Sequence, residues 1–217
     1  MRLSKRLEAV ASFLSPEEGV IDVGCNHAHL CLFLALHQHP SRLIASDCNP
    51  KSLTNAMMDA KKYQVEEQIE FVVTDGLDGQ SILPTDVVVI AGLGTRTILQ
   101  ILKPEVLKQG NHFILQSNRD LEILRTYMME HGFYLKAELP VMDRKKEYVV
   151  MDWWKGEVSY TPFELRYGPC ILKDQQKEYM RHQIEWLEQQ IKRCENAPEL
   201  QKQYREEIEH IKKLDWI

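Results

Sequence analysis

Short apolar runs alternate with longer amphipathic stretches over the first 130 residues of the chain. Each run holds a few apolar residues, stops at a polar residue or glycine, and is followed by apolar positions at helical spacing. This alternation predicts a parallel sheet with helices on both of its faces. The five runs expected to form strands are 20–23, 43–45, 69–73, 86–90 and 112–116.

Helices are predicted between these runs and before the first of them. Asn49 suits the cap of one helix because Pro50, which follows it, is favoured at a first helical position. Ser4 could cap a shortened version of the first helix. The segments expected to be helical are Arg2–Leu14, Ala28–Leu36, Pro50–Tyr63, Thr95–Leu102 and Asp120–Glu130.

The pattern changes after Gly132. Phe133–Val141 and Glu147–Trp154 are predicted to be two strands of a hairpin, so the sheet should end in an antiparallel pair. The segment 156–168 contains Pro162 and two glycines and is expected to be a linker.

The last part of the chain is predicted to be a helical hairpin. One apolar seam runs through Met180, Ile184, Leu187, Ile191 and Cys194 at heptad spacing, and a second lies between Leu200 and Leu214. Two such helices joined by a short break should pack antiparallel, like a small coiled coil. We therefore expect an α/β domain over residues 1–158 and a helical hairpin over residues 159–217.

Composition narrows the class of protein. A chain of 217 residues suits one main domain with an appendage, and no stretch approaches the ~20 apolar residues of a membrane span. The N-terminal charges are too interspersed for a secretory signal, so a soluble cytoplasmic protein is expected. The net charge of −5 argues against a surface wrapped in nucleic acid but allows a local basic patch.

The five cysteines do not indicate a metal site or a disulfide framework. None of them has C-x-x-C spacing, and their number is odd, so we expect reduced thiols, no structural zinc and no metal. Cys25 and Cys48 fall in loops that follow predicted strands. They are interpreted as small lining residues because neither has a dedicated base partner.

Acids and glycines end four successive predicted strands. Ligands of open α/β sheets bind at the carboxyl ends of strands, where the strand order reverses. Asp47 follows Asp22 by 25 positions and suits a pair of ribose hydroxyls. Gly24 stands alone where a dinucleotide fingerprint would have three glycines, so an ordinary strand-to-helix turn is the competing interpretation.

Five short motifs together resemble the TrmK family over essentially the whole chain. They are LSKRL at 3–7, DVGCNHAHL at 22–30, TDGL at 74–77, AGLGT at 91–95 and LQSN at 115–118. The family consists of bacterial class I S-adenosylmethionine-dependent methyltransferases, which methylate N1 of adenine 22 in tRNA. The resemblance therefore implies a Rossmann-like methyltransferase sheet, S-adenosyl-L-methionine as cofactor and tRNA as partner.

The resemblance also implies which residues form the site. In such enzymes the first loop holds the methionine part of the cofactor, the acid after the second strand holds the ribose, and the acid after the third lies near adenine. The cofactor residues would be Asp22, Gly24, Cys25, Asn26, His27, Asp47, Cys48, Asp75, Gly76, Ala91 and Gly92. The substrate residues would be Arg6, Leu93, Gly94, Thr95, Gln116, Asn118, Arg119, Arg144 and Lys145.

The implied reaction asks little acid–base chemistry of the protein. Unprotonated adenine N1 is already nucleophilic, so the protein should supply alignment and a dry pocket without a strong general base. Asn118 and His27 are the candidates for any catalytic role, with loop capping and a structural histidine as the alternatives. Further phosphate contacts would come from Arg2, Lys5, Arg125 and Lys146.

The chain departs from the family pattern at three motifs. Cys25-Asn26 replaces Ser-Asp, Thr95 replaces a glycine and Ser117 replaces a proline. An amide at Asn26 can still form hydrogen bonds but is expected to weaken cofactor binding. Two alternatives follow: a methyltransferase for small molecules, and a non-catalytic cofactor-binding module. The hairpin could bind tRNA or protein, and a monomer is favoured.

Overall fold

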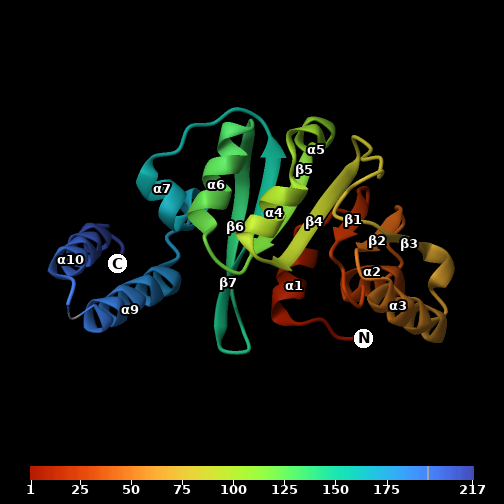
Figure 1. Ribbon diagram of the computed structural model, residues 1–217, viewed down its shortest axis with the longest axis horizontal. Coiled ribbons are helices and arrows are strands. Elements are labelled where there is room, and N and C mark those ends of the chain that lie inside the picture. The colour runs from red at the N-terminus through yellow and green to blue at the C-terminus, as the bar shows by residue number, and fades with distance from the viewer. Residues whose placement is uncertain (195) are drawn as a thin grey trace. The chain divides into compact units, whose positions relative to one another are not determined.

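Seven strands form one sheet in the order β3-β2-β1-β4-β5-β7-β6 among the residues that the structure describes, 1–194 and 196–217 (Figure 1). The structure is a computed structural model. The strands are β1 (Gly19–Val23), β2 (Leu43–Asp47), β3 (Ile69–Val73), β4 (Asp86–Leu93), β5 (His112–Ser117), β6 (Phe133–Asp143) and β7 (Lys146–Lys155).

The sheet has the predicted class. Strands β1 to β5 pair in parallel, while β7 is antiparallel to both β5 and β6. The order reverses at β1, which lies between β2 and β4, so the carboxyl ends of β1 and β4 flank the crevice where ligands of this architecture bind.

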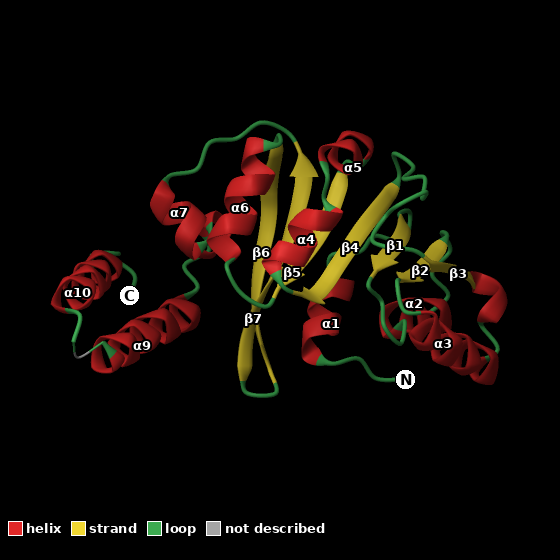
Figure 2. Cartoon of the chain, in the orientation of Figure 1, coloured by secondary structure: helices red, strands yellow, loops and turns green. Residues whose placement is uncertain are grey.

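Helices cover both faces of the sheet (Figure 2). One core cluster joins α1, α2 and α3 to one side of the central strands, through residues such as Val87 and Val89. Val88 and Ile90 alternate with these residues and are also buried, on the side of α4 and α6. The helices of this part are α1 (Lys5–Ala11), α2 (His29–Leu36), α3 (Pro50–Tyr63), the 3-10 turn η1 (Glu66–Gln68), α4 (Thr95–Ile101), α5 (Pro104–Gln109) and α6 (Leu121–Glu130).

The first helix is shorter than the predicted segment. It starts after Ser4, whose hydroxyl accepts a hydrogen bond from the Leu7 backbone N–H at 3.3 Å. This side-chain bond replaces an intrahelical partner that the first turn lacks, which is why the helix begins here.

The β6–β7 hairpin turns more tightly than predicted, through two residues. Arg144 and Lys145 both have positive φ, at 47° and 64°. Two-residue turns of this kind favour Asn-Gly because L side chains rarely adopt that backbone. The chain therefore places two basic residues where local backbone preference would not.

The segment predicted as a linker contains a helix, α7 (Pro162–Tyr167). Thr161 and Glu164 form a capping box, and Pro162 occupies the first turn. The compact unit therefore extends to Gly168, ten residues beyond the boundary expected from the sequence.

The second compact unit, 169–217, contains the predicted helical hairpin. Its main helices are α9 (Lys177–Arg193) and α10 (Pro198–Lys212), after the short α8 (Pro169–Lys173). Trp186 and Tyr204 meet edge to face with ring centroids 6.3 Å apart. The predicted break between the helices includes residue 195, which lies outside the described residues.

None of the helices among the residues described is long and apolar enough to cross a membrane.

A buried histidine joins three elements at the amino end of β5. Nδ1 of His112 lies 2.6 Å from Glu18, and its Nε2 lies 2.7 Å from Asp152 of β7. Burial alone would lower the pKa of His112, but hydrogen bonds to Asp152 and Glu18 raise it above the ordinary value of 6.5. The imidazolium is therefore favoured by the fold.

This arrangement predicts a pH-dependent stability. Because the pKa of His112 is raised in the folded state, its stabilising contribution is complete below about pH 6.5 and is lost as pH rises through the folded value. His112→Gln should cost about 2–3 kcal/mol at pH 6 and less at pH 8.5, measured by urea unfolding. His131→Gln is the matched control, since His131 is exposed at the C-terminal end of α6, where its ring contacts Tyr127 and its Nδ1 bonds the Tyr127 carbonyl. An equal loss at both pH values for His112→Gln would contradict the ion-pair interpretation.

Candidate functional site

The loop after β1 is bound to the end of β2. The backbone N–H groups of Gly24 and Cys25 donate to the Ser46 carbonyl at 2.8 and 3.0 Å. Gly24 has φ +69°, and a Cβ there would lie 3.3 Å from Leu93 of β4, so this turn favours glycine. The chain thus passes close to two neighbouring strand ends before α2 begins.

Asp47 fixes the same loop with its carboxylate. Its Oδ2 accepts from the Asn26 N–H at 2.8 Å, and its Oδ1 accepts from the Asn49 N–H at 2.8 Å. Each carboxylate oxygen has a second lone pair, so Asp47 can still accept bonds from a ligand. The acid predicted to hold a ribose therefore also orders the backbone beside it.

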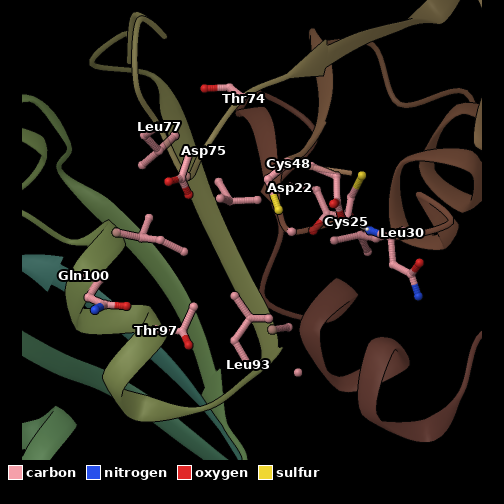
Figure 3. Close-up of a pocket in the computed structure, with 18 of the residues that line it drawn as sticks. Asp22, Cys25, Leu30, Cys48, Thr74, Asp75, Leu77, Leu93, Thr97 and Gln100 are labelled. Carbon is pink, nitrogen blue, oxygen red and sulfur yellow. Dashed lines mark hydrogen bonds between the residues drawn. The ribbon is translucent and has the colours of Figure 1, made fainter. Parts of the chain in front are cut away.

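A cavity of about 1000 Å³, here called the first cavity, opens at the carboxyl ends of β1 to β4 (Figure 3). In the figure, Asp22, Cys25 and Cys48 group together, while Thr97 and Gln100 project from α4. Every residue that the sequence assigned to the cofactor contributes to its lining. These are Asp22, Gly24, Cys25, Asn26, His27, Asp47, Cys48, Asp75, Gly76, Ala91 and Gly92.

The carboxyl of Asp22 is the most perturbed acid of the first cavity. It is 7% exposed and forms no hydrogen bond among the described residues. Burial, and then the nearby charge of Asp47, raises the pKa of Asp22 to about 7. A buried carboxyl without a partner favours a cationic ligand beside it.

The thiol of Cys25 is unsuited to attack. Burial, followed by the charges of Asp22 and Asp47, raises the pKa of Cys25 well above its ordinary value. A thiol that stays protonated at neutral pH is a poor nucleophile. This agrees with its interpretation as a lining residue.

Arg6 is the basic residue of α1 that lies at the site. Its Nη1 donates to Oε1 of Gln116 at 2.8 Å, and Gln116 is fully buried in β5. Gly92 has φ +88°, and a Cβ there would come within 2.5 Å of Arg6 Nη1. The guanidinium therefore packs on bare backbone at the bulge of β4.

A second cavity, of about 670 Å³, lies beside the first. The two share Arg6, Leu7, Asn26, His29 and Gly92 as lining residues. The remaining lining of the second cavity is Met1, Arg2, Leu3, Ser4, Leu32, Asp59, Tyr63, Asn118, Asp143, Arg144, Lys146 and Tyr148.

The residues expected to bind substrate are placed differently from one another. Leu93 lines the first cavity, Asn118 and Arg144 line the second, and Arg6 lines both. Gly94, Arg119 and Lys145 line neither, and Arg119 and Lys145 are exposed.

Thr95 and Gln116 are both buried, Thr95 as the first residue of α4 and Gln116 within β5. The Thr95 hydroxyl lies 2.7 Å from that of Ser117 and donates to the Arg119 carbonyl at 2.5 Å. The Gln116 side chain accepts the hydrogen bond from Arg6. Neither side chain lines either cavity; Thr95 holds the segment after β5, and Gln116 holds Arg6.

One proposed phosphate contact is wrong. Arg125 is fully buried on the face of α6 that carries Leu124 and Met128, and its Nε donates to Glu138 at 2.8 Å. Its Nη1 donates to the carbonyls of Leu165 and Arg166, so it attaches α7 to α6 and β6. It cannot reach a nucleic acid.

Part of the lining of the first cavity was not predicted from the sequence. Thr97, Gln100 and Ile101 lie at helical spacing on one side of α4, and their spacing is the signal that could have indicated a shared face. The others that sequence reasoning missed are Leu7, Val23, His29, Leu30, Thr74, Leu77, Asp78, Leu99, Lys103, Pro104 and Tyr127.

Comparison with protein families gives one match to most of the chain. Residues 3–151 match the family model described as a methyltransferase domain. A Bacillus subtilis protein, the tRNA (adenine(22)-N(1))-methyltransferase, is 25% identical over 189 residues, covering 83% of this chain and 79% of its own length.

Solved structures with the same fold cover nearly the whole chain. A Streptococcus pneumoniae protein, a candidate tRNA (m1A22) methyltransferase in complex with S-adenosyl-L-methionine, is 27% identical with TM-score 0.80, covering 98% of this chain and 99% of its own. Mycoplasma capricolum TrmK in complex with S-adenosyl-homocysteine is 24% identical with TM-score 0.80, covering 100% of both chains. The latter likeness concerns the fold alone.

Proposed function

This chain belongs to the methyltransferase domain family, and from that membership we propose that it methylates N1 of adenine 22 in tRNA with S-adenosyl-L-methionine as donor. The observation that carries the proposal is the first cavity at the switch point, where Asp22, Asp47 and Asp75 end three neighbouring strands. The B. subtilis relative supports the substrate. We propose the cytoplasm as its compartment, because tRNA is the proposed substrate.

The residues of the first cavity fit this cofactor. Four acids, Asp22, Asp47, Asp75 and Asp78, face it against two cations, Arg6 and Lys103, which favours a positively charged ligand. Asp22 would pair with the cationic methionine part. Asp47 would accept from the ribose hydroxyls. The close backbone at Gly24 leaves room that a side chain would fill.

When bound, S-adenosyl-L-methionine supplies a methyl group on a sulfonium, which is electrophilic without help from a metal. The protein's contribution is to align the target base and to exclude water. Asn118 has a fitting place, since its Nδ2 donates to the Gly92 carbonyl at 2.8 Å. Its Oδ1 would accept from the exocyclic amine of adenine, whose N–H becomes more acidic as N1 gains a methyl group.

The raised pKa of Asp22 predicts that cofactor affinity rises with pH. The cationic ligand favours the ionised carboxyl, and burial together with Asp47 raises the pKa of Asp22 in the free protein to about 7. Affinity should therefore increase about five- to tenfold between pH 6 and pH 7.5, as the carboxyl ionises. Calorimetric titration with S-adenosyl-homocysteine at a series of pH values measures this.

Asp22→Asn is the variant that isolates this effect. Its affinity should be lower at pH 7.5 and nearly independent of pH in the same range. Asp78→Asn is a matched control because Asp78 also lines the first cavity but is exposed and paired with Lys103 at 3.2 Å. An unchanged pH profile in Asp22→Asn would rule out Asp22 as the group that titrates.

The proposed reaction is tested by methyl transfer from labelled S-adenosyl-L-methionine to an unmodified bacterial tRNA transcript. We expect label in N1-methyladenosine after nuclease digestion, and none with a transcript that carries guanine at position 22. Labelling of the guanine-22 transcript would show another position. Cofactor binding without transfer to any tRNA would favour a small-molecule acceptor or a non-catalytic module.

A further inference from the structure

We propose that the second cavity receives the target adenosine of tRNA and that Tyr148 is the residue on which its base stacks. The proposal deepens the proposed function and rests on it. It assigns a role to a tyrosine of β7 that no sequence motif singled out. The target is recognised here as a purine nucleotide within RNA, extruded from its own stack.

The position of the second cavity suits the acceptor of a methyl group. It shares Arg6, Asn26 and Gly92 with the first cavity, so their contents can meet. Its volume of about 670 Å³ lies in the range of pockets for small ligands, which includes a nucleotide. Asn118 lines the second cavity and is anchored to the Gly92 carbonyl at that junction.

Tyr148 offers an aromatic face in the second cavity. The Cζ of Arg6 lies 5.4 Å from its ring centroid, and the Nζ of Lys146 lies 5.1 Å from the same point. A half-buried ring in contact with cations is a surface on which RNA bases commonly stack. An unstacked adenine offers the matching flat face.

The two cations beside the Tyr148 ring differ in how firmly other groups hold them. Arg6 is held by Gln116 and by the backbone at Gly92, so it keeps its place. Lys146 is exposed and forms no ion pair among the described residues. When a base arrives, the Lys146 ammonium can therefore move from the ring to a phosphate. Arg6 meanwhile keeps its contacts with Gln116 and Tyr148.

The rim of the second cavity has the charge that an RNA backbone requires. Arg2, Arg144 and Lys146 line it together with Arg6, against two acids, Asp59 and Asp143. Arg144 occupies a positive-φ turn position that favours Asn or Gly. Basic residues at an unfavourable backbone position, beside a cavity, are consistent with a functional demand for their charge. Extruding a base costs a few kcal/mol, which phosphate contacts of this kind offset.

The test compares Tyr148→Ala with Tyr148→Phe in the full chain. Steady-state methylation of the adenine-22 transcript should show kcat/KM for tRNA lowered about ten- to hundredfold in Tyr148→Ala, because one stacking contact is lost. Tyr148→Phe keeps the ring and should remain near the unaltered chain. The Kd for S-adenosyl-homocysteine should stay the same in both, since Tyr148 does not line the first cavity.

Tyr134→Ala is the matched control. Tyr134 is a half-buried tyrosine on the neighbouring strand β6 and lines neither cavity. It should change kcat/KM little at a temperature where all variants are folded. A normal kcat/KM in Tyr148→Ala, or an equal loss in Tyr134→Ala, would overturn the assignment while leaving the proposed function intact.

Photocrosslinking gives a readout that needs no turnover. A transcript with 8-azidoadenosine at position 22 should crosslink to the peptide that contains Tyr148, and the crosslink should be lost in Tyr148→Ala. A crosslink confined to other peptides would overturn the assignment. An unaltered chain that neither methylates nor crosslinks the transcript would overturn the proposed function and this inference together.

Discussion

Replacing Asp47 with alanine is expected to weaken cofactor binding by about thirtyfold to several hundredfold, equivalent to about 2–4 kcal/mol. Two losses combine. The carboxylate would no longer accept from the ribose hydroxyls, and the Asn26 and Asn49 N–H groups would lose the acceptor that holds each of them at 2.8 Å. The loop that lines the first cavity would therefore lose order as well as charge.

Calorimetric titration with S-adenosyl-homocysteine measures this loss. Asp75→Ala should weaken binding less, because Asp75 is exposed and its carboxylate accepts no hydrogen bond that orders a loop among the described residues. Glu67→Ala is the control for a change of charge, since Glu67 is exposed and lines neither cavity. Equal affinity in Asp47→Ala and the unaltered chain would remove Asp47 from the cofactor site.

Arg125→Ala is expected to cost about 3–5 kcal/mol of unfolding free energy. The ion pair between Arg125 and Glu138 is fully buried, so removing the arginine would leave a carboxylate without its cation. The carbonyls of Leu165 and Arg166 would lose their donor as well. The measurement is urea unfolding followed by circular dichroism.

A double variant separates the ion pair from packing. Arg125→Met with Glu138→Leu replaces both charges by apolar groups of similar size, which usually restores most of the lost stability. Some loss should remain because the two carbonyls stay without a donor. Arg166→Ala is a control, since the ion pair of Arg166 with Glu122, at 3.5 Å, lies at the surface. A loss below about 1 kcal/mol in Arg125→Ala would show that water reaches Glu138.

The grouping of the residues that line the first cavity could be predicted because it follows from topology. Parallel strands bring their carboxyl ends to one edge, so Asp22, Asp47 and Asp75 had to meet once their strands were recognised. The antiparallel end of the sheet was equally visible in the change of pattern after Gly132. These features depend on the arrangement of the backbone alone, so they could be predicted without knowing where side chains point.

The surroundings of the second cavity depend on side-chain directions, which the spacing of residues in the sequence does not encode. Thr95 begins α4 beside the first cavity, yet its hydroxyl bonds to Ser117 and the Arg119 carbonyl. Gln116 is the last residue but one of β5 and is buried like the rest of that strand, whereas Asn118 lies just after the strand and is exposed. Tyr148 reaches the second cavity only through the pairing of β7 with β6, a contact between segments that no local motif reports.

The sequence contained signals for two further features that differ from the predictions, the burial of Arg125 and the helix α7. Arg125 lies between Leu124 and Met128 on the apolar stripe of its helix, a position that favours burial in an ion pair. Thr161-Pro162 with Glu164 is a capping box followed by a favoured first-turn proline. Both were outweighed by simpler expectations, that arginines contact phosphate and that proline and glycine mark linkers.

Met1 and Arg2 line the second cavity, so the start of the chain forms part of its wall. Residues fused ahead of Met1 would start at this wall, beside the space proposed for the nucleotide. An affinity tag at that end should therefore obstruct tRNA while leaving the first cavity open to its ligand. The choice of tagged end is therefore a practical decision for every tRNA assay described above.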